Sequence, residues 1–227
     1  MARAIVRYHA SWDREPPLRA PPGMRLAIDP WKRHAASDDS FCRWPPPLKN
    51  GTEELASAID ALNDAAGHGY AETIDAIRRE RSDAVAAEGS APPLVLSFSH
   101  MLPRQELMPE KRHLFTPTLH SIVGSTFLNA RVEALRPMLH AFGHSHFAWD
   151  MTLPSGQTGD DPVRYVSWPL CTPHERARRV PYALDKAACK AWLPIKLWDA
   201  ATGLTGELDD CYFSDLCMSY KGRRSEW

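Results

Sequence analysis

The chain has almost no net charge, no long apolar run and no closely spaced cysteine pair. It carries 27 Lys and Arg against 28 Asp and Glu in 227 residues, and this balance lacks the basic excess typical of nucleic-acid-binding domains. No segment reaches the roughly 18 consecutive apolar residues of a membrane-spanning helix, and the N-terminus has no apolar signal-peptide core. The five cysteines predict reduced thiols and no disulfide framework, which is typical of an intracellular protein.

Motifs for several common activities are also absent. The sequence contains no glycine-rich phosphate loop and no recognisable Ser-His-Asp arrangement, and its cysteines lack zinc-site spacing. What it does contain is a composition of 44% hydrophobic and 24% charged residues, which predicts one globular domain with a sizeable core. Its 20 prolines predict long loops, above all in the first 50 residues, where a strand stub at 4–6 is expected.

Helical spacing of apolar residues predicts three helices. Two of them are expected in residues 50–88, where Asn50, followed three residues later by Glu53, is a candidate N-cap for the first. The second is expected to begin near Tyr70. A third helix is expected to span residues 116–137, because a proline is tolerated in a first helical turn.

Two apolar segments of strand length flank the third helix. Residues 94–99 form a near-continuous apolar run, which predicts a buried strand that ends at His100. Residues 138–142 predict a second strand, and Gly143 after it would let the backbone turn sharply, because glycine has no Cβ to clash. A strand, a helix and a strand in succession predict a parallel pair, whose following loops both open at the carboxyl edge of the sheet.

The C-terminal third of the chain predicts further strands. Residues 147–152 and 163–168 are expected to pair as a hairpin around the turn sequence P-S-G. Residues 192–198 are apolar enough to predict an edge strand.

Three histidines follow the two strands of the parallel pair: His100, His144 and His146. Imidazole nitrogens are common metal ligands and suit divalent ions such as Zn, Mn or Fe. Because both loops are expected at one sheet edge, the three imidazoles predict a metal site there. Taken alone, His144 and His146 are open to the simpler interpretation that two of ten histidines lie close together by chance. A site with two ions would bind a phosphate oxygen to both metals and generate hydroxide from water near neutral pH.

Segments around these histidines resemble the calcineurin-like metallophosphoesterases. Residues 142–146, F-G-H-S-H, resemble the last metal-binding motif of that family, G-H-x-H. Residues 96–100, L-S-F-S-H, resemble the preceding motif, a strand that ends in Ser/Gly-His. Residues 8–13 and 165–176 are similar to segments that follow the third and the last motif in some members.

The resemblance implies a fold, a ligand set and an activity. His100 and His144 would bind the second metal ion, and His146 would bind the first. Residues 1–180 would be the C-terminal portion of an α/β domain, a partial metallophosphoesterase-type β-sandwich flanked by helices, with the N-terminal β-α-β part missing. Residues 181–227 would be a C-terminal extension packed on that domain. The implied activity is hydrolysis of phosphomonoester or phosphodiester substrates by a dinuclear site of divalent ions such as Mn, Fe or Zn.

Three motifs of the family are absent from the sequence: D-x-H, G-D-x-x-D and G-N-H-D/E. In the family they supply the metal-bridging Asp, an Asn ligand and the His thought to protonate the leaving group. The resemblance therefore implies an incomplete catalytic domain, which would bind one ion through its three imidazoles and hydrolyse phosphoesters poorly or not at all. Two alternatives stay open: a catalytically inactive remnant that acts as a binding or structural module, and a domain stabilised by a single zinc ion.

Other candidate residues have simpler interpretations. Asp150 lies four residues beyond His146 and could reach the site, but an ordinary hairpin position is the simpler interpretation. Arg104 could contact a substrate phosphate or lie on the surface. A basic cluster is expected to be a solvated loop: Arg176, Arg178 and Arg179. Three further histidines are expected not to be ligands: His113, His120 and His140.

Overall fold

The structure is a computed structural model of the 227-residue chain. It describes residues 4–19, 22–23, 37–65, 69–87, 93–111, 114, 116–155, 162–170, 172–173 and 194–206. The chain divides into two compact units. The helical unit comprises Met1–Leu96 and Met101–Pro137, and the sheet unit comprises Ser97–His100 and Met138–Trp227.

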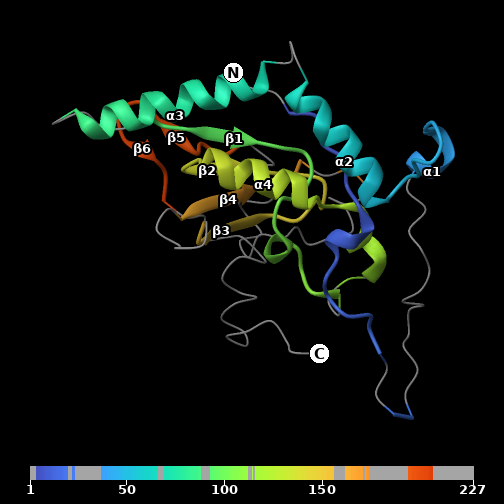
Figure 1. The fold of residues 1–227 in the computed structure, drawn as a ribbon. Coiled ribbons are helices and arrows are strands. Elements are labelled where there is room, and N and C mark those ends of the chain that lie inside the picture. The colour runs from blue at the N-terminus through green and yellow to red at the C-terminus, as the bar shows by residue number, and fades with distance from the viewer. Residues whose placement is uncertain are drawn as a thin grey trace. The chain divides into compact units, whose positions relative to one another are not determined.

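The described elements make the protein a mixed α/β fold with several helices and a mixed sheet, as Figure 1 shows. The α-helices are α1 (Ser37–Phe41), α2 (Glu53–Ala61), α3 (Tyr70–Ala86) and α4 (Thr126–Leu135). The 3₁₀ helices are η1 (Ala10–Trp12), η2 (Leu62–Asp64), η3 (Gln105–Leu107) and η5 (Pro117–Ile122). The strands are β1 (Leu96–Phe98), β2 (Leu139–Ala141), β3 (Trp149–Leu153), β4 (Val163–Ser167), β5 (Trp198–Asp199) and β6 (Gly203–Leu204). Within the described residues, no helix is both long enough and apolar enough to cross a membrane.

The N-terminal segment 4–19 contains η1 and no strand, so the strand stub predicted near Ile5 was wrong. The backbone of Ile5 pairs instead with a side-chain amide: its N–H donates to Asn63 Oδ1 (2.6 Å), and its carbonyl accepts from Asn63 Nδ2 (2.8 Å). Further along the segment, the ammonium group of Lys111 donates to Asp13 Oδ2 (2.8 Å). The side chain of Asn63 thus satisfies the backbone groups of Ile5 that a sheet would otherwise have satisfied.

Helix α2 begins after Thr52, whose side chain accepts a hydrogen bond from the N–H of Leu55. The prediction that Asn50 is the N-cap was therefore wrong by two residues. Asn50 Oδ1 accepts instead from Trp44 Nε1 (2.7 Å) and from Arg7 Nη2 (3.1 Å). Both residues favour an N-cap because each has a side-chain oxygen, so tertiary contacts decide which of them caps the helix. The second predicted helix is confirmed as α3.

The single helix predicted for residues 116–137 is two helices, η5 and α4. The break lies at Gly124, where a Cβ atom would be 2.1–2.4 Å from ring atoms of Trp12. The indole therefore occupies the space that a side chain would need. Ser125 then caps α4 by accepting a hydrogen bond from the N–H of Leu128. Apolar spacing continues through the break, which is why the pattern alone predicted one helix.

Arginine side chains hold α4 against its neighbours in the helical unit. Arg131 donates to both carboxylate oxygens of Asp60 (2.6 and 2.8 Å) and to Asp64 Oδ2 (2.9 Å). Arg78 and Arg81 of α3 donate to main-chain carbonyls at the C-terminal end of α4. The last carbonyls of a helix have no partner within the helix, so these guanidinium groups satisfy acceptors that would otherwise need water.

The sheet unit contains a four-stranded sheet in the order β1-β2-β4-β3. Strands β2 and β4 are parallel, with His140 opposite Tyr165. Strands β3 and β4 are antiparallel, with Met151 opposite Tyr165, which confirms the predicted hairpin. Residues 156–161 in its turn lie outside the described residues. Since β4 lies beside both β2 and β3, its residues contact both, and all five of its side chains are buried.

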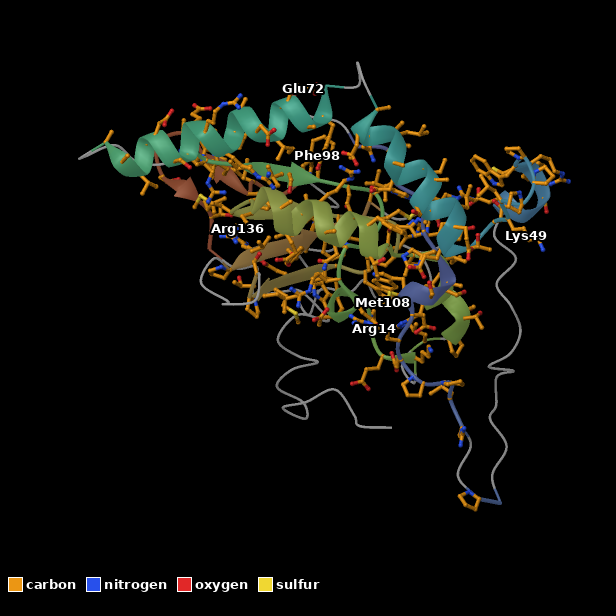
Figure 2. The ribbon with its side chains drawn as sticks, in the orientation of Figure 1. Arg14, Lys49, Glu72, Phe98, Met108 and Arg136 are labelled. Atoms are coloured by element: carbon orange, nitrogen blue, oxygen red, sulfur yellow. The ribbon has the colours of Figure 1, made fainter. Side chains whose placement is uncertain are left out.

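Strand β1 is shorter than predicted and lies at an edge of the sheet, so the prediction of a buried strand was wrong. Leu96 is 46% exposed and Phe98, labelled in Figure 2, is 73% exposed. Ser97 and Ser99 alternate with them and contact β2 through their hydroxyls. An apolar run of strand length does not distinguish an edge strand from a central one, because the position in the sheet depends on pairing with distant segments.

The C-terminal strands form a second, two-stranded sheet of β5 and β6. The edge strand predicted for residues 192–198 is reduced to β5, and residues 191–193 lie outside the described residues. Arg164 of β4 joins this hairpin to the main sheet by donating to the carbonyls of Thr205 and Gly206. Most of the predicted extension, residues 181–227, lies outside the described residues.

Candidate functional site

The histidine turn begins where β2 ends. The N–H of Phe142 still donates to the carbonyl of Val166 (2.9 Å), which continues the parallel pairing with β4 by one residue. The backbone then turns at His144 and His146, whose φ angles are 65° and 59°. Gly143 does not occupy this left-handed region, so the prediction that the glycine makes the sharp turn was wrong.

Two left-handed residues that are not glycine make this turn strained. Each such residue costs about 1–3 kcal/mol and persists only where surrounding contacts fix it. Ser145, between the two histidines, supplies such contacts: it is buried, its N–H donates to the carbonyl of Gly143 (2.8 Å), and its Oγ accepts from the N–H of Phe147 (3.4 Å). Strained backbone of this kind is found preferentially at functional sites.

His100 and His144 face each other across the end of the sheet. The distance between His144 Nδ1 and His100 Nε2 is 2.8 Å, and the ring centroids are 4.7 Å apart at an interplanar angle of 76°. At this distance one nitrogen donates its proton and the other accepts it with a lone pair, so at least one of the two rings is neutral. The prediction that both histidine loops open at one sheet edge is confirmed by this contact.

The structure does not assemble a complete metal site. In the described part of the chain, no group of three or more His, Cys, Asp or Glu side chains is placed to hold a metal ion. Of the three predicted ligands, His100 and His144 are in contact in the structure. His146 lies two residues beyond His144 on the same strained turn. A metal ion bound by these three histidines therefore stays a prediction.

A second histidine contact lies within the sheet, at His140 of β2. Ser97 Oγ lies 2.7 Å from its Nδ1, and Ser99 Oγ lies 2.9 Å from its Nε2. Burial lowers the pKa of His140 to about 4, because the charged form loses its hydration. His140 was expected not to be a metal ligand, and both of its nitrogens contact serine hydroxyls. The two serines were not identified from sequence, although their alternation before His100 puts both on one face of a strand.

The remaining candidates are engaged elsewhere. Asp150 is buried and forms a bidentate ion pair with Arg164, with Nε–Oδ1 and Nη2–Oδ2 distances of 2.8 and 2.6 Å. Arg104 forms ion pairs with Glu106 and Glu133 in the helical unit, so its side chain is not a free surface cation. Two further predictions fall outside the described residues: that His113 is not a ligand, and that the basic cluster of Arg176, Arg178 and Arg179 is a solvated loop.

Comparisons of the chain with protein-family models, with curated proteins and with solved structures gave no match. The site is therefore characterised by its own geometry. That geometry consists of two facing imidazoles at a sheet edge, a strained turn that carries one of them, and a buried histidine on the strand that leads into the turn.

Proposed function

We propose that this chain is a metal-dependent phosphoesterase module that holds one divalent ion through His100 and His144, with His146 as a third ligand. The observation that carries the proposal is the 2.8 Å distance between His144 Nδ1 and His100 Nε2. Two nitrogen donors that converge from separate loops at the end of a sheet are a donor set suited to Zn, Mn or Fe.

The separation of the two nitrogens supports a single shared ion. Imidazole nitrogens lie about 2.0–2.1 Å from such an ion, so two of them on one ion lie about 2.9–3.4 Å apart for octahedral or tetrahedral angles. The distance of 2.8 Å between His100 and His144 is about 0.1 Å below the lower end of this range. Exchange of the shared proton for a metal ion thus requires only a small separation of the rings.

The strained turn supports the same proposal. A chain gains nothing in stability from left-handed conformations at His144 and His146. A role in binding explains both angles, because they fix the direction of two imidazoles within three residues of each other. In the proposal, His146 would complete the donor set from the same turn as His144 when an ion is bound.

The substrate class follows from the resemblance of the turn and of the strand before His100 to metallophosphoesterase motifs. A divalent ion held here would polarise a phosphoryl oxygen as a Lewis acid. The protein residues would hold the ion and orient it at the sheet edge. The partial β-sandwich of that family is part of the proposal, with the four-stranded mixed sheet as the portion that carries the site. We expect slow turnover, since the chain lacks the motifs that supply a bridging carboxylate.

Metal titration of the full chain tests the first step. Calorimetric titration with Zn²⁺ and visible absorption with Co²⁺ should each give one ion per chain. His100→Ala and His144→Ala should weaken binding at least about tenfold, as loss of a ligand predicts, whereas His146→Ala should have a smaller effect. Glu80→Gln, which removes an exposed carboxylate on α3, is the matched control and should leave the affinity unchanged. A wild-type chain that binds neither ion stoichiometrically would rule the proposal out.

Hydrolysis of 4-nitrophenyl phosphate and bis(4-nitrophenyl) phosphate with added Mn²⁺, Zn²⁺ or Co²⁺ tests the second step. A rate above the protein-free metal control that disappears in His144→Ala supports the phosphoesterase. One bound ion without turnover supports instead the second candidate, a metal-binding module without catalytic activity. The observation in favour of that candidate is that the buried carboxylate of Asp150 is paired with Arg164.

A further inference from the structure

His140 joins β1 to β2 through both of its ring nitrogens. Ser97 and Ser99 lie two residues apart, so their side chains point to the same face of β1. The imidazole bridges the two hydroxyls, with distances of 2.7 and 2.9 Å. The ring is 1% exposed and packs edge-on against Tyr165 of β4, with centroids 5.8 Å apart. One side chain thus connects three neighbouring strands.

The charge state of His140 fixes the direction of these hydrogen bonds. Burial lowers the pKa of His140 to about 4, so the ring is neutral near pH 7. A neutral imidazole has one N–H and one lone pair. One serine hydroxyl therefore accepts from the ring and the other donates to it, and each serine matches a different nitrogen. This complementarity holds the strand pair in one register.

The geometry of these residues suits a link between strands. A serine next to a histidine could also be a nucleophile with its general base. His140, however, is 1% exposed, and each of its two ring nitrogens contacts a different serine hydroxyl. The serine–histidine contacts therefore act on position.

The position that they control is that of His100. Ser99 directly precedes His100, and its N–H donates to the carbonyl of Ala141 (2.9 Å), the residue after His140. Ser99 is thus held through both its backbone and its hydroxyl at the last point before the chain reaches the site. Among the described strands β1 pairs with β2 at the edge of the sheet, so contacts with β2 hold its end.

We propose that His140 is a positioning residue for the facing pair: through Ser97 and Ser99 it holds the end of β1 where His100 meets His144. The consequence for metal affinity rests on the proposed function. The positioning itself does not depend on an ion, because it rests on the contacts of His140 with Ser97 and Ser99 and on the backbone contact of Ser99 with Ala141.

Imidazole ¹⁵N NMR of the metal-free full chain tests the positioning directly. In the wild type, the nitrogens of His100 and His144 should show the shifts of a hydrogen-bonded pair. His140→Phe keeps a ring against Tyr165 but removes both hydroxyl contacts, and should move these shifts toward those of free imidazole. Ser99→Ala, a smaller change that keeps His140, should move them in the same direction. Ser121→Ala, which removes a serine hydrogen bond to Thr118 in the helical unit, should leave them unchanged.

Co²⁺ binding supplies the second readout. His140→Phe and Ser99→Ala should weaken the affinity by up to about tenfold, less than the loss of the ligand His100, and alter the visible spectrum. His140→Gln should recover part of the loss, because its amide keeps a donor and an acceptor. The positioning role is refuted if both His140→Phe and Ser99→Ala keep the wild-type imidazole shifts. A wild-type chain that does not bind Co²⁺ refutes the proposed function instead, and the imidazole shifts then decide the positioning alone.

Discussion

Replacement of Asp150 distinguishes a structural carboxylate from a metal ligand. The Arg164 guanidinium forms two hydrogen bonds with it, at 2.8 and 2.6 Å, and the two side chains are 9% and 1% exposed. Asp150→Ala would leave the Arg164 cation buried without its partner, which costs about 3–5 kcal/mol. Since a domain of this size has a free energy of unfolding of about 5–15 kcal/mol, we expect a large fall in stability.

Urea unfolding of the metal-free chain measures this cost, and Co²⁺ titration below the unfolding transition measures the affinity. We expect Asp150→Ala to lower the free energy of unfolding and to keep Co²⁺ affinity within about threefold of the wild type. The double variant Asp150→Leu with Arg164→Met should cost less than the sum of the two single changes, because no charge is then left unpaired. If Asp150→Ala unfolds within about 1 kcal/mol of the wild type but loses Co²⁺ binding, Asp150 is a ligand and the reasoning is refuted.

Three further predictions concern stability. Arg131→Ala should lower the free energy of unfolding by about 1–3 kcal/mol, and Arg131→Lys should recover little of it, because an ammonium group cannot bind both oxygens of Asp60 as a planar fork does. Gly124→Ala should cost about 1–3 kcal/mol in a thermal melt and shift Trp12 fluorescence, because its Cβ would overlap the indole. Stability should fall as pH decreases from 6.5 to about 4, by up to about 3 kcal/mol from His140, since the unfolded ring is protonated in this range while the folded ring stays neutral. In urea unfolding across this pH range, the His140→Gln variant should lack the loss of stability that comes from His140. An unchanged pH dependence in this variant would contradict the prediction.

Local sequence patterns identified the elements of the fold better than their boundaries. Strand β2, helix α3 and the hairpin of β3 and β4 were predicted from local apolar patterns and turn residues, and the structure confirms them. The cap of α2 was placed at Asn50, whereas the structure uses Thr52. Both residues carry a suitable oxygen, and tertiary contacts with Trp44 and Arg7 engage that of Asn50. The break at Gly124 likewise depends on Trp12, which lies more than a hundred residues away in sequence. No local pattern contains this information.

The sequence predicted which imidazoles of the candidate site meet, but it did not predict the backbone conformation of the turn that carries them. The strand before His100 and the turn after β2 predicted that two imidazoles meet, and the facing pair confirms this. The sharp bend was assigned to Gly143 from its conformational freedom, but His144 and His146 adopt the left-handed angles. Intrinsic preference favours glycine in such a conformation, so surrounding contacts must overcome it, and these are tertiary.

The electrostatics of the sheet edge favour one ion over two. Two dications about 3.5–4 Å apart repel by roughly 17 kcal/mol at an effective dielectric constant of about 20, and neutral imidazoles carry no charge to offset this. Asp150 cannot supply the missing charge without leaving Arg164 unpaired, at a cost of about 3–5 kcal/mol. With a single ion, His146 would have no separate metal to bind, and the proposed site would use it as a third ligand to the same ion. Removal of His146 should therefore weaken the binding of one ion and leave the stoichiometry of one per chain unchanged.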